Sequence, residues 1–107
     1  DRWGSVLVGS NGYSEVGAVV GATHKEQAKR LREIMPKSFF LVPGYGAQGG
    51  KAEDLEVCFD KNGLGAIINS SRGIIANHIK ENMNGKDFAK ASRQAVIDMK
   101  EDLRRCI

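Results

Sequence analysis

The sequence predicts an α/β fold in which three short parallel strands alternate with helices. Apolar runs typical of strands that are buried on both faces occur at 16–22, 39–42 and 65–69. Segments with apolar residues at helical spacing lie between and after these runs. Strands that alternate with helices pair in parallel through right-handed crossovers, so we expect a parallel sheet covered by helices. The 107 residues have the length of one small domain, 1–107.

The first unit begins with the run VGAVVGA at 16–22. Thr23 and Glu26 follow this run with the spacing of a capping box, which predicts that a helix begins there. An apolar stripe at helical spacing continues as far as Met35. Pro36 ends the predicted helix, because proline lacks the amide proton that a helix interior needs.

The second unit has its strand at 39–42, and a glycine-rich loop leads from that strand into a helix that is expected to end at Asn62 and Gly63. The third strand, 65–69, leads into the sequence SSRG and a short apolar turn. A last helix is predicted from about Lys86 to Arg105. Its spacing predicts a buried face made of Phe88, Ala91, Ala95, Met99 and Leu103.

The composition is that of an ordinary globular protein, with 41% hydrophobic and 27% charged residues. The net charge of +3 is spread over helices on which both signs alternate, so a nucleic-acid partner is not expected. No apolar run approaches the roughly 18 residues of a membrane span, and no secretory leader is recognisable, so no membrane partner and a cytoplasmic location are expected. Cys58 and Cys106 lack the spacing of a redox or metal motif and are expected to be reduced packing residues.

The loop that follows the second strand, within LVPGYGAQGGK, contains the pattern G-x-G-x-x-G. A dinucleotide fingerprint of this form needs an acidic residue about 20 positions further on to hold the ribose hydroxyls. Counting on from Gly49 leads to Asn69, and no Asp or Glu occurs between Asp60 and Glu81. The loop therefore fails the test for a dinucleotide fingerprint.

Two consecutive strands nevertheless end in loops suited to binding a phosphate group. In the first loop, glycines allow the backbone to approach a ligand and Gln48 adds a polar side chain. The second loop, NSSRG, offers hydroxyls, free N–H groups at a helix start, and Arg72, whose guanidinium matches phosphate geometry. The last two βα loops of (β/α) barrels commonly form such a site. The sequence therefore favours a barrel over an open doubly wound sheet.

The segments GAVVGAT, LVPGYGAQGG and IINSSRGI, in this order and spacing, resemble the final three βα units of orotidine 5′-phosphate decarboxylase, particularly its longer bacterial subfamily. The resemblance covers nearly the whole chain and is strongest over 16–76. It implies an α/β fold that forms the C-terminal three βα units of a TIM (β/α)8 barrel, incomplete in this chain. It also implies decarboxylation of orotidine 5′-phosphate to uridine 5′-phosphate in pyrimidine biosynthesis, with no metal and no cofactor.

The resemblance also implies roles for four substrate-binding residues. Gln48 would reach the phosphate from a mobile loop, and Arg72 would grip it. Ser71 would donate a backbone N–H, and Pro43 would line the pyrimidine pocket. The D-x-K-x-x-D motif that carries the family's chemistry does not occur in the sequence. The catalytic residues are therefore expected outside this chain, and the isolated chain is expected to be an inactive part of a carbon–carbon lyase.

A complete enzyme of this kind would take a nucleoside monophosphate and is expected to be a homodimer. A barrel needs about 250 residues, so this chain is expected to accompany the missing N-terminal half of the barrel or to self-associate. Two alternatives stay open. One is another phosphate-binding barrel enzyme that acts on a sugar or pyrimidine phosphate, and the other is a non-catalytic nucleotide-binding module of Rossmann type.

Overall fold

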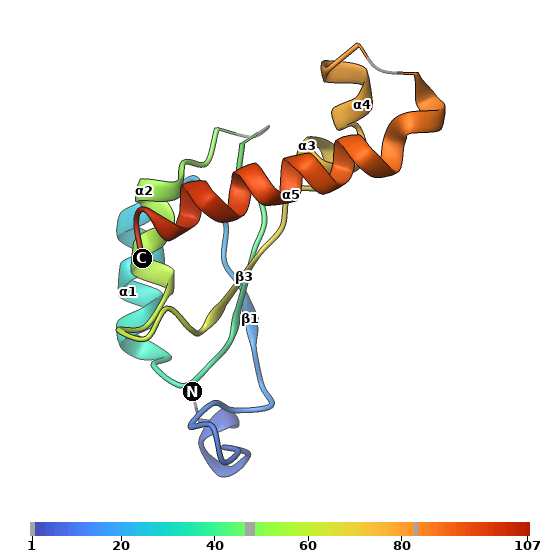
Figure 1. Ribbon diagram of the computed structural model, residues 1–107. Helices are drawn as coiled ribbons and strands as arrows, with labels where there is room; N and C mark the ends of the chain where they lie inside the picture. Colours follow the sequence, from blue (N-terminus) through green and yellow to red (C-terminus); the bar gives the residue numbers. More distant parts are fainter. Residues whose placement is uncertain (1, 47–48, 83) are drawn as a thin grey trace.

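The computed structural model describes residues 2–46, 49–82 and 84–107, which contain a three-stranded parallel sheet with helices (Figure 1). The strands are β1 (Ala18–Val19), β2 (Phe40–Val42) and β3 (Ala66–Ile68), in the spatial order β1-β2-β3. The helical segments are η1 (Gly4–Val6), α1 (Lys25–Ile34), α2 (Ala52–Leu55), η2 (Glu56–Cys58), α3 (Ser71–Ile75), α4 (Asn77–Lys80), η3 (Gly85–Asp87) and α5 (Phe88–Arg104), where η denotes a 3-10 helix. The three strands lie within the three apolar runs predicted from the sequence, and their parallel pairing confirms the predicted α/β class.

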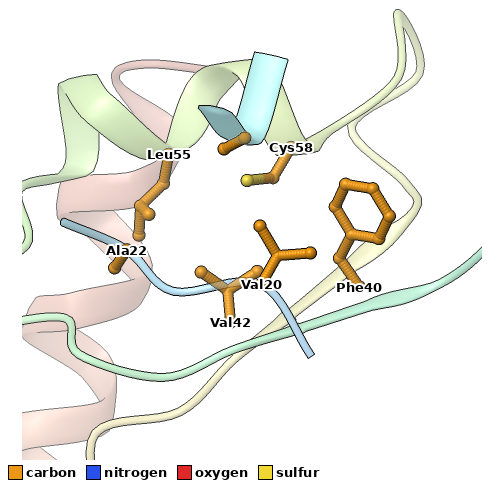
Figure 2. Close-up of a cluster of buried hydrophobic side chains, with 7 residues drawn as sticks. Val20, Ala22, Phe40, Val42, Leu55 and Cys58 are labelled. Atoms are coloured by element: carbon orange, nitrogen blue, oxygen red, sulfur yellow. The ribbon is translucent and has the colours of Figure 1, made fainter. Parts of the chain in front are cut away.

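The hydrophobic core lies between the sheet and the helices α1, α2 and η2, which are grouped on one side of the strands in Figure 1. Figure 2 shows Val20 and Val42 directed towards Leu55 and Cys58, with Phe40 beside them. Phe40, Val42 and Cys58 are completely buried. A side chain of this size gains about 1.5–3 kcal/mol on burial, so these contacts fix the helices on the sheet.

The opposite face of the sheet carries an exposed apolar row made of Val19, Leu41 and Ile67. These three residues occupy paired positions on neighbouring strands. Their exposed fractions are 70%, 44% and 62%. Successive side chains of a strand point to opposite faces, so the row is the counterpart of the buried Phe40 and Val42. The described residues thus cover one face of the sheet and leave the other open.

The helix α1 ends at Ile34, just before Pro36, as predicted. Its start differs from the prediction, because His24 rather than Thr23 is the residue that precedes the helix and no side chain caps it. The hydroxyl of Thr23 lies 3.0 Å from His24 Nδ1, so it is engaged with a neighbouring ring instead of a helical N–H. The predicted capping box with Glu26 is therefore wrong.

The second helical segment is shorter than predicted, because η2 ends at Cys58 and Phe59 is already extended. The carbonyl oxygen of Cys58 accepts hydrogen bonds from the Arg32 guanidinium and is not used to continue a helix. The turn that follows is held by Asp60, whose carboxylate accepts the N–H groups of Asn62 and Leu64.

The chain after β3 forms two short helices, α3 and α4, where the sequence predicted a brief turn. The last helix, α5, matches the prediction within two residues at each end. Of its predicted apolar face, Ala91 is buried, while Phe88 is 56% exposed. The N-terminal half of α5 extends beyond the sheet, so Phe88 has no strand to pack against (Figure 1).

Arg32 of α1 ties together the segments that lead into and out of the strands. Its guanidinium lies 3.8 Å over the ring of Phe40. It donates hydrogen bonds of 2.7 to 3.1 Å to the backbone carbonyl oxygens of Met35, Ser38, Cys58 and Gly65. The planar arrangement of five N–H donors makes arginine suited to bind several carbonyls at once.

Gly65, which accepts one of these bonds, has a positive φ of 99°. A Cβ atom at this position would collide with the Tyr13 hydroxyl and would lie 3.2 Å from Arg32 Nη2. The Tyr13 hydroxyl donates to Asp60 at 2.8 Å, and its ring stacks on Phe39 at 4.5 Å. Burial lowers the pKa of Arg32, while neighbouring Tyr13 and Asp60 act against that shift. Glycine at position 65 thus makes room for a polar cluster around the guanidinium.

We predict that Arg32→Met lowers the free energy of unfolding by about 3 kcal/mol, because it leaves several backbone carbonyls without their donor. Arg32→Lys should lose most of the same amount, since an ammonium lacks the planar fork. Arg30→Met is the matched control, because Arg30 lies on the same helix, is 70% exposed and pairs only with Glu33 at 3.1 Å among the described residues. The control should cost less than about 1 kcal/mol. Urea denaturation measures all three variants, and equal losses at positions 30 and 32 would contradict the role given to Arg32.

Candidate functional site

The two loops predicted to bind phosphate begin side by side at the carboxyl ends of β2 and β3. Val42 and Ile68 are paired at the ends of these strands. The N–H of Asn69 donates to the carbonyl oxygen of Val42 at 3.0 Å, which extends the pairing by one step. The parallel register thus places Pro43 and Asn69 at the same edge of the sheet.

Glycines shape the first loop. The φ values of Gly44, Gly46 and Gly49 are 98°, 74° and 88°, and residues other than glycine rarely adopt such values. The Gly46 N–H donates to the carbonyl oxygen of Gly50 at 2.8 Å, and the Gly50 N–H donates to that of Gly44 at 3.0 Å. A Cβ atom on Gly50 would lie 2.6 Å from the Gly44 oxygen and 2.7 Å from Ala22 Cβ. The described part of the loop is therefore closed on itself and packed against Ala22, which lies between β1 and α1.

Ser70 attaches the second loop to the first. Its hydroxyl donates to the carbonyl oxygen of Tyr45 at 3.1 Å, and the residue is only 7% exposed. A Cβ atom on Gly73 would lie 2.5 Å from Ser70 Oγ, so the small residue at position 73 leaves room for this hydroxyl. Ser71 and Arg72 follow immediately in the first turn of α3 and are thereby held beside the glycine loop.

Three of the four predicted substrate-binding residues line one cavity of about 80 Å³. They are Pro43, Ser71 and Arg72. This volume exceeds the roughly 10–15 Å³ that admits one water molecule, so the cavity can receive a group of several atoms. The fourth predicted residue, Gln48, lies outside the described residues. Among the residues that are described, no carboxylate forms an ion pair with Arg72, and none lines this small cavity.

Tyr45 is the residue of this site whose contacts the sequence did not predict. Its hydroxyl donates to Asp102 Oδ2 of α5 at 2.5 Å. Burial, assisted by this hydrogen bond to a carboxylate, raises the pKa of Tyr45. The two residues are 57 positions apart, so no local pattern in the sequence predicts this contact.

A larger hollow of about 700 Å³ adjoins the small cavity and lies between α5 and the pair α3 and α4. Tyr45, Ser70 and Arg72 line both spaces. Figure 1 shows α3 and α4 lying along the N-terminal half of α5. Charges of both signs reach the larger hollow, from Lys80, Glu81, Asp98, Asp102 and Arg105. Arg72 therefore lies at the boundary between the small cavity and the larger hollow.

The described residues contain no group of three or more His, Cys, Asp and Glu side chains placed to hold a metal ion. Cys58 and Cys106 are free thiols, and burial raises the pKa of Cys58. Within the same parts of the chain, no helix has the length and apolar character needed to cross a membrane.

Comparisons with known proteins give one consistent result. No family model matches the chain. A protein named orotidine 5′-phosphate decarboxylase from Caldicellulosiruptor saccharolyticus is 53% identical over 106 residues, which cover 99% of this chain and 34% of that protein. A protein of the same name from Clostridium tetani is 50% identical over 104 residues, covering 97% of this chain and 35% of that protein.

Solved structures agree with these sequences. The structure of Leishmania donovani OMP decarboxylase matches with a TM-score of 0.67 and 28% identity, covering 98% of this chain and 37% of that one. The structure of Leishmania donovani UMP synthase matches with a TM-score of 0.60 and 34% identity, covering 85% of this chain and 18% of that one.

The fold is therefore that of consecutive βα units from a parallel α/β barrel, with a glycine loop and a short helix joined at the strand ends. More particularly, the chain is homologous to orotidine 5′-phosphate decarboxylase, and it spans about a third of the length of the curated relatives that it matches. These findings confirm the family resemblance and the barrel class predicted from the sequence.

We predict that Gly50→Ala lowers the free energy of unfolding by about 1–3 kcal/mol, because its Cβ would overlap both Gly44 and Ala22. Gly21→Ala is the matched control, since no atom lies within 4 Å of a Cβ at that position. Urea denaturation should separate the two variants. Hydrogen exchange should also quicken at the Gly46 amide in Gly50→Ala, because that amide donates to the Gly50 carbonyl. An unchanged exchange rate would contradict the close packing of the loop.

Proposed function

We propose that this chain supplies the phosphate-binding part of an orotidine 5′-phosphate decarboxylase, which forms uridine 5′-phosphate in pyrimidine biosynthesis in the cytoplasm. The observation that carries the proposal is the cavity lined jointly by Pro43, Ser71 and Arg72. This cavity lies where two loops of adjacent parallel strands are joined by a hydrogen bond. The identity of 53% to a protein named for this reaction supports the assignment.

Each residue of the cavity contributes a different interaction with a nucleoside monophosphate. The Arg72 guanidinium donates two parallel hydrogen bonds to phosphate oxygens and keeps its charge at any physiological pH. Ser71 lies in the first turn of α3, where backbone N–H groups have no partner within the helix, and one of them donates to the same phosphate. Pro43 presents an apolar surface to the pyrimidine. Gln48 adds a neutral hydrogen bond to the phosphate.

The phosphate group is remote from the carboxylate that leaves, so its binding assists the reaction indirectly. Binding energy from a non-reacting part of a substrate accelerates the reaction when it is expressed in the transition state. Ordering of the glycine loop over the phosphate provides such a coupling. The lysine and aspartate groups that would act on the reacting carbon are proposed to lie outside this chain, and the proposed reaction uses no metal and no cofactor.

The exposed row of Val19, Leu41 and Ile67 supports a proposal about partners. Apolar side chains on the uncovered face of a parallel sheet require another layer, because such sheets are buried on both faces. We assign this row to the interior of a barrel whose other strands come from the remainder of the enzyme. The isolated chain would cover the same row by self-association, and the complete enzyme is proposed to be a homodimer.

The structure offers less support for a Rossmann-type nucleotide module. In that fold the pyrophosphate lies at the N-terminus of a long helix after the glycine loop, and an acidic side chain holds the ribose. Here the helix after the loop, α2, has four residues, and Asn69 occupies the place of the acid. Another phosphate-binding barrel enzyme has the same loops, and it is distinguished by whether orotidine 5′-phosphate itself binds.

We predict that Arg72→Ala in the complete enzyme weakens the binding of uridine 5′-phosphate about 30-fold or more and leaves uridine binding nearly unchanged. Loss of a charge partner from a bound anion costs about 2–5 kcal/mol, whereas a nucleoside has no phosphate for the guanidinium to meet. Gln48→Ala should cost only about 0.5–1.5 kcal/mol, because it removes a neutral hydrogen bond. Isothermal titration calorimetry gives both dissociation constants.

Arg93→Ala is the matched control, because Arg93 is an exposed arginine of α5 that lines neither cavity. Its removal should leave both affinities unchanged. If Arg72→Ala weakened nucleotide and nucleoside equally, Arg72 would be holding the fold, and the cavity would not be a phosphate site.

We also predict that the isolated 107 residues show no decarboxylase activity, because the sequence lacks the lysine and aspartate motif of the reaction. The absorbance change of orotidine 5′-phosphate on decarboxylation measures this directly. Turnover by the purified chain, free of any full-length enzyme, would place the catalytic groups inside this chain and overturn the division of labour proposed above.

A further inference from the structure

Tyr45 and Asp102 connect the glycine loop to the last helix. Asp102 lies in the final turn of α5, which is a helix of 17 residues and hence a rigid support. Its Oδ2 accepts the Tyr45 hydroxyl at 2.5 Å. Figure 1 shows the C-terminal end of α5 alongside α2, so the anchor comes from the side of the sheet that carries the core. The hydrogen bond fixes a residue of the loop from outside the loop.

Tyr45 is also the point at which the two loops meet. Its carbonyl oxygen accepts the Ser70 hydroxyl at 3.1 Å. It forms a parallel bridge with Gly50, at the far side of the glycine loop. Tyr45 is therefore connected to both sides of the glycine loop and, through Ser70, to the segment that carries Arg72 two positions further on.

The protonation of Tyr45 suits this role. Burial and the neighbouring carboxylate raise the pKa of the phenol, so the hydroxyl stays a donor at physiological pH. The hydrogen bond also occupies an oxygen of Asp102, which lines the same hollow as Arg72.

We propose that Asp102 is a positioning residue for the phosphate-binding loops and acts through the hydroxyl of Tyr45. This inference rests on the proposed function, because it assigns Arg72 to a phosphate group. Glycine-rich segments have much conformational freedom, and ordering them on binding reduces affinity. An anchor at Tyr45 removes part of that cost in advance. Its loss should therefore weaken ligands that carry a phosphate and leave ligands without one unaffected.

The test uses the complete enzyme with the variants Tyr45→Phe, Asp102→Ala and the double variant, and two probes, uridine 5′-phosphate and uridine. Each single variant should weaken uridine 5′-phosphate about 10-fold, which is the scale of one hydrogen bond to a charged group. Uridine affinity should not change. The double variant should lose no more than either single variant, because both remove the same bond.

Two further variants of α5 test whether Asp102 acts by holding Tyr45 or through its negative charge alone. Asp102→Asn retains an oxygen acceptor and should restore most of the affinity for uridine 5′-phosphate. Glu101→Ala removes an equal charge from the neighbouring position of α5, where Glu101 is exposed and lines neither cavity, and should leave affinity unchanged. Should Asp102→Ala fail to fold, Tyr45→Phe removes a single oxygen atom and carries the same comparison.

Equal weakening of both probes, or additive losses in the double variant, would overturn the proposal. Arg72→Ala is measured in parallel. A phosphate-selective loss in Arg72→Ala without one in Tyr45→Phe would refute the positioning role alone. The absence of a phosphate-selective loss in Arg72→Ala would refute the proposed phosphate site itself.

Discussion

The structure depends on the hydrogen bonds that the Arg32 guanidinium donates to backbone carbonyl oxygens near the amino ends of the strands. A three-stranded sheet with strands of two or three residues has few ladder hydrogen bonds, so its register needs another source of order. Arg32 bonds to the carbonyl of Ser38 just before β2 and to that of Gly65 just before β3. These bonds hold β2 and β3 in register at their amino ends, and the same register pairs Val42 with Ile68 at their carboxyl ends.

This arrangement separates the two ends of the sheet by their chemistry. The amino ends are held by a charged fork, an aromatic stack and the turn around Asp60, which together restrict movement. The carboxyl ends carry glycines with positive φ values and a recess lined by Arg72. Strands that are held in register at one end allow the loops at the other end to present their groups accurately.

The sequence predicted the strands because short continuous apolar runs are typical of strands buried on both faces. It predicted the end of α1 because proline interrupts a helix at its own position, whatever the rest of the fold. Pro43, Ser71 and Arg72 came together as expected, since the ends of adjacent parallel strands must meet. Several of the errors depend on parts of the chain that are distant in the sequence, whereas the failed capping box has a local cause in the contact between Thr23 and His24. The exposure of Phe88 reflects the position of the sheet, beyond which the N-terminal half of α5 extends, and the shortened second helix reflects the bond from Arg32 to Cys58, 26 positions away. Likewise, the pairing of Tyr45 with Asp102 leaves no local pattern that could be read in advance.

The open apolar row of Val19, Leu41 and Ile67 has a consequence for how such a chain reaches its structure. Each strand pairs with its neighbour in sequence, so the core between the sheet and α1 can assemble from nearby segments without waiting for distant ones. The same row then leaves a half-finished surface on an already ordered unit. Until another layer covers it, that surface can associate with any exposed strand or apolar segment, including those of other copies of the chain. Rapid local folding and exposure to misassembly are thus two results of the same topology.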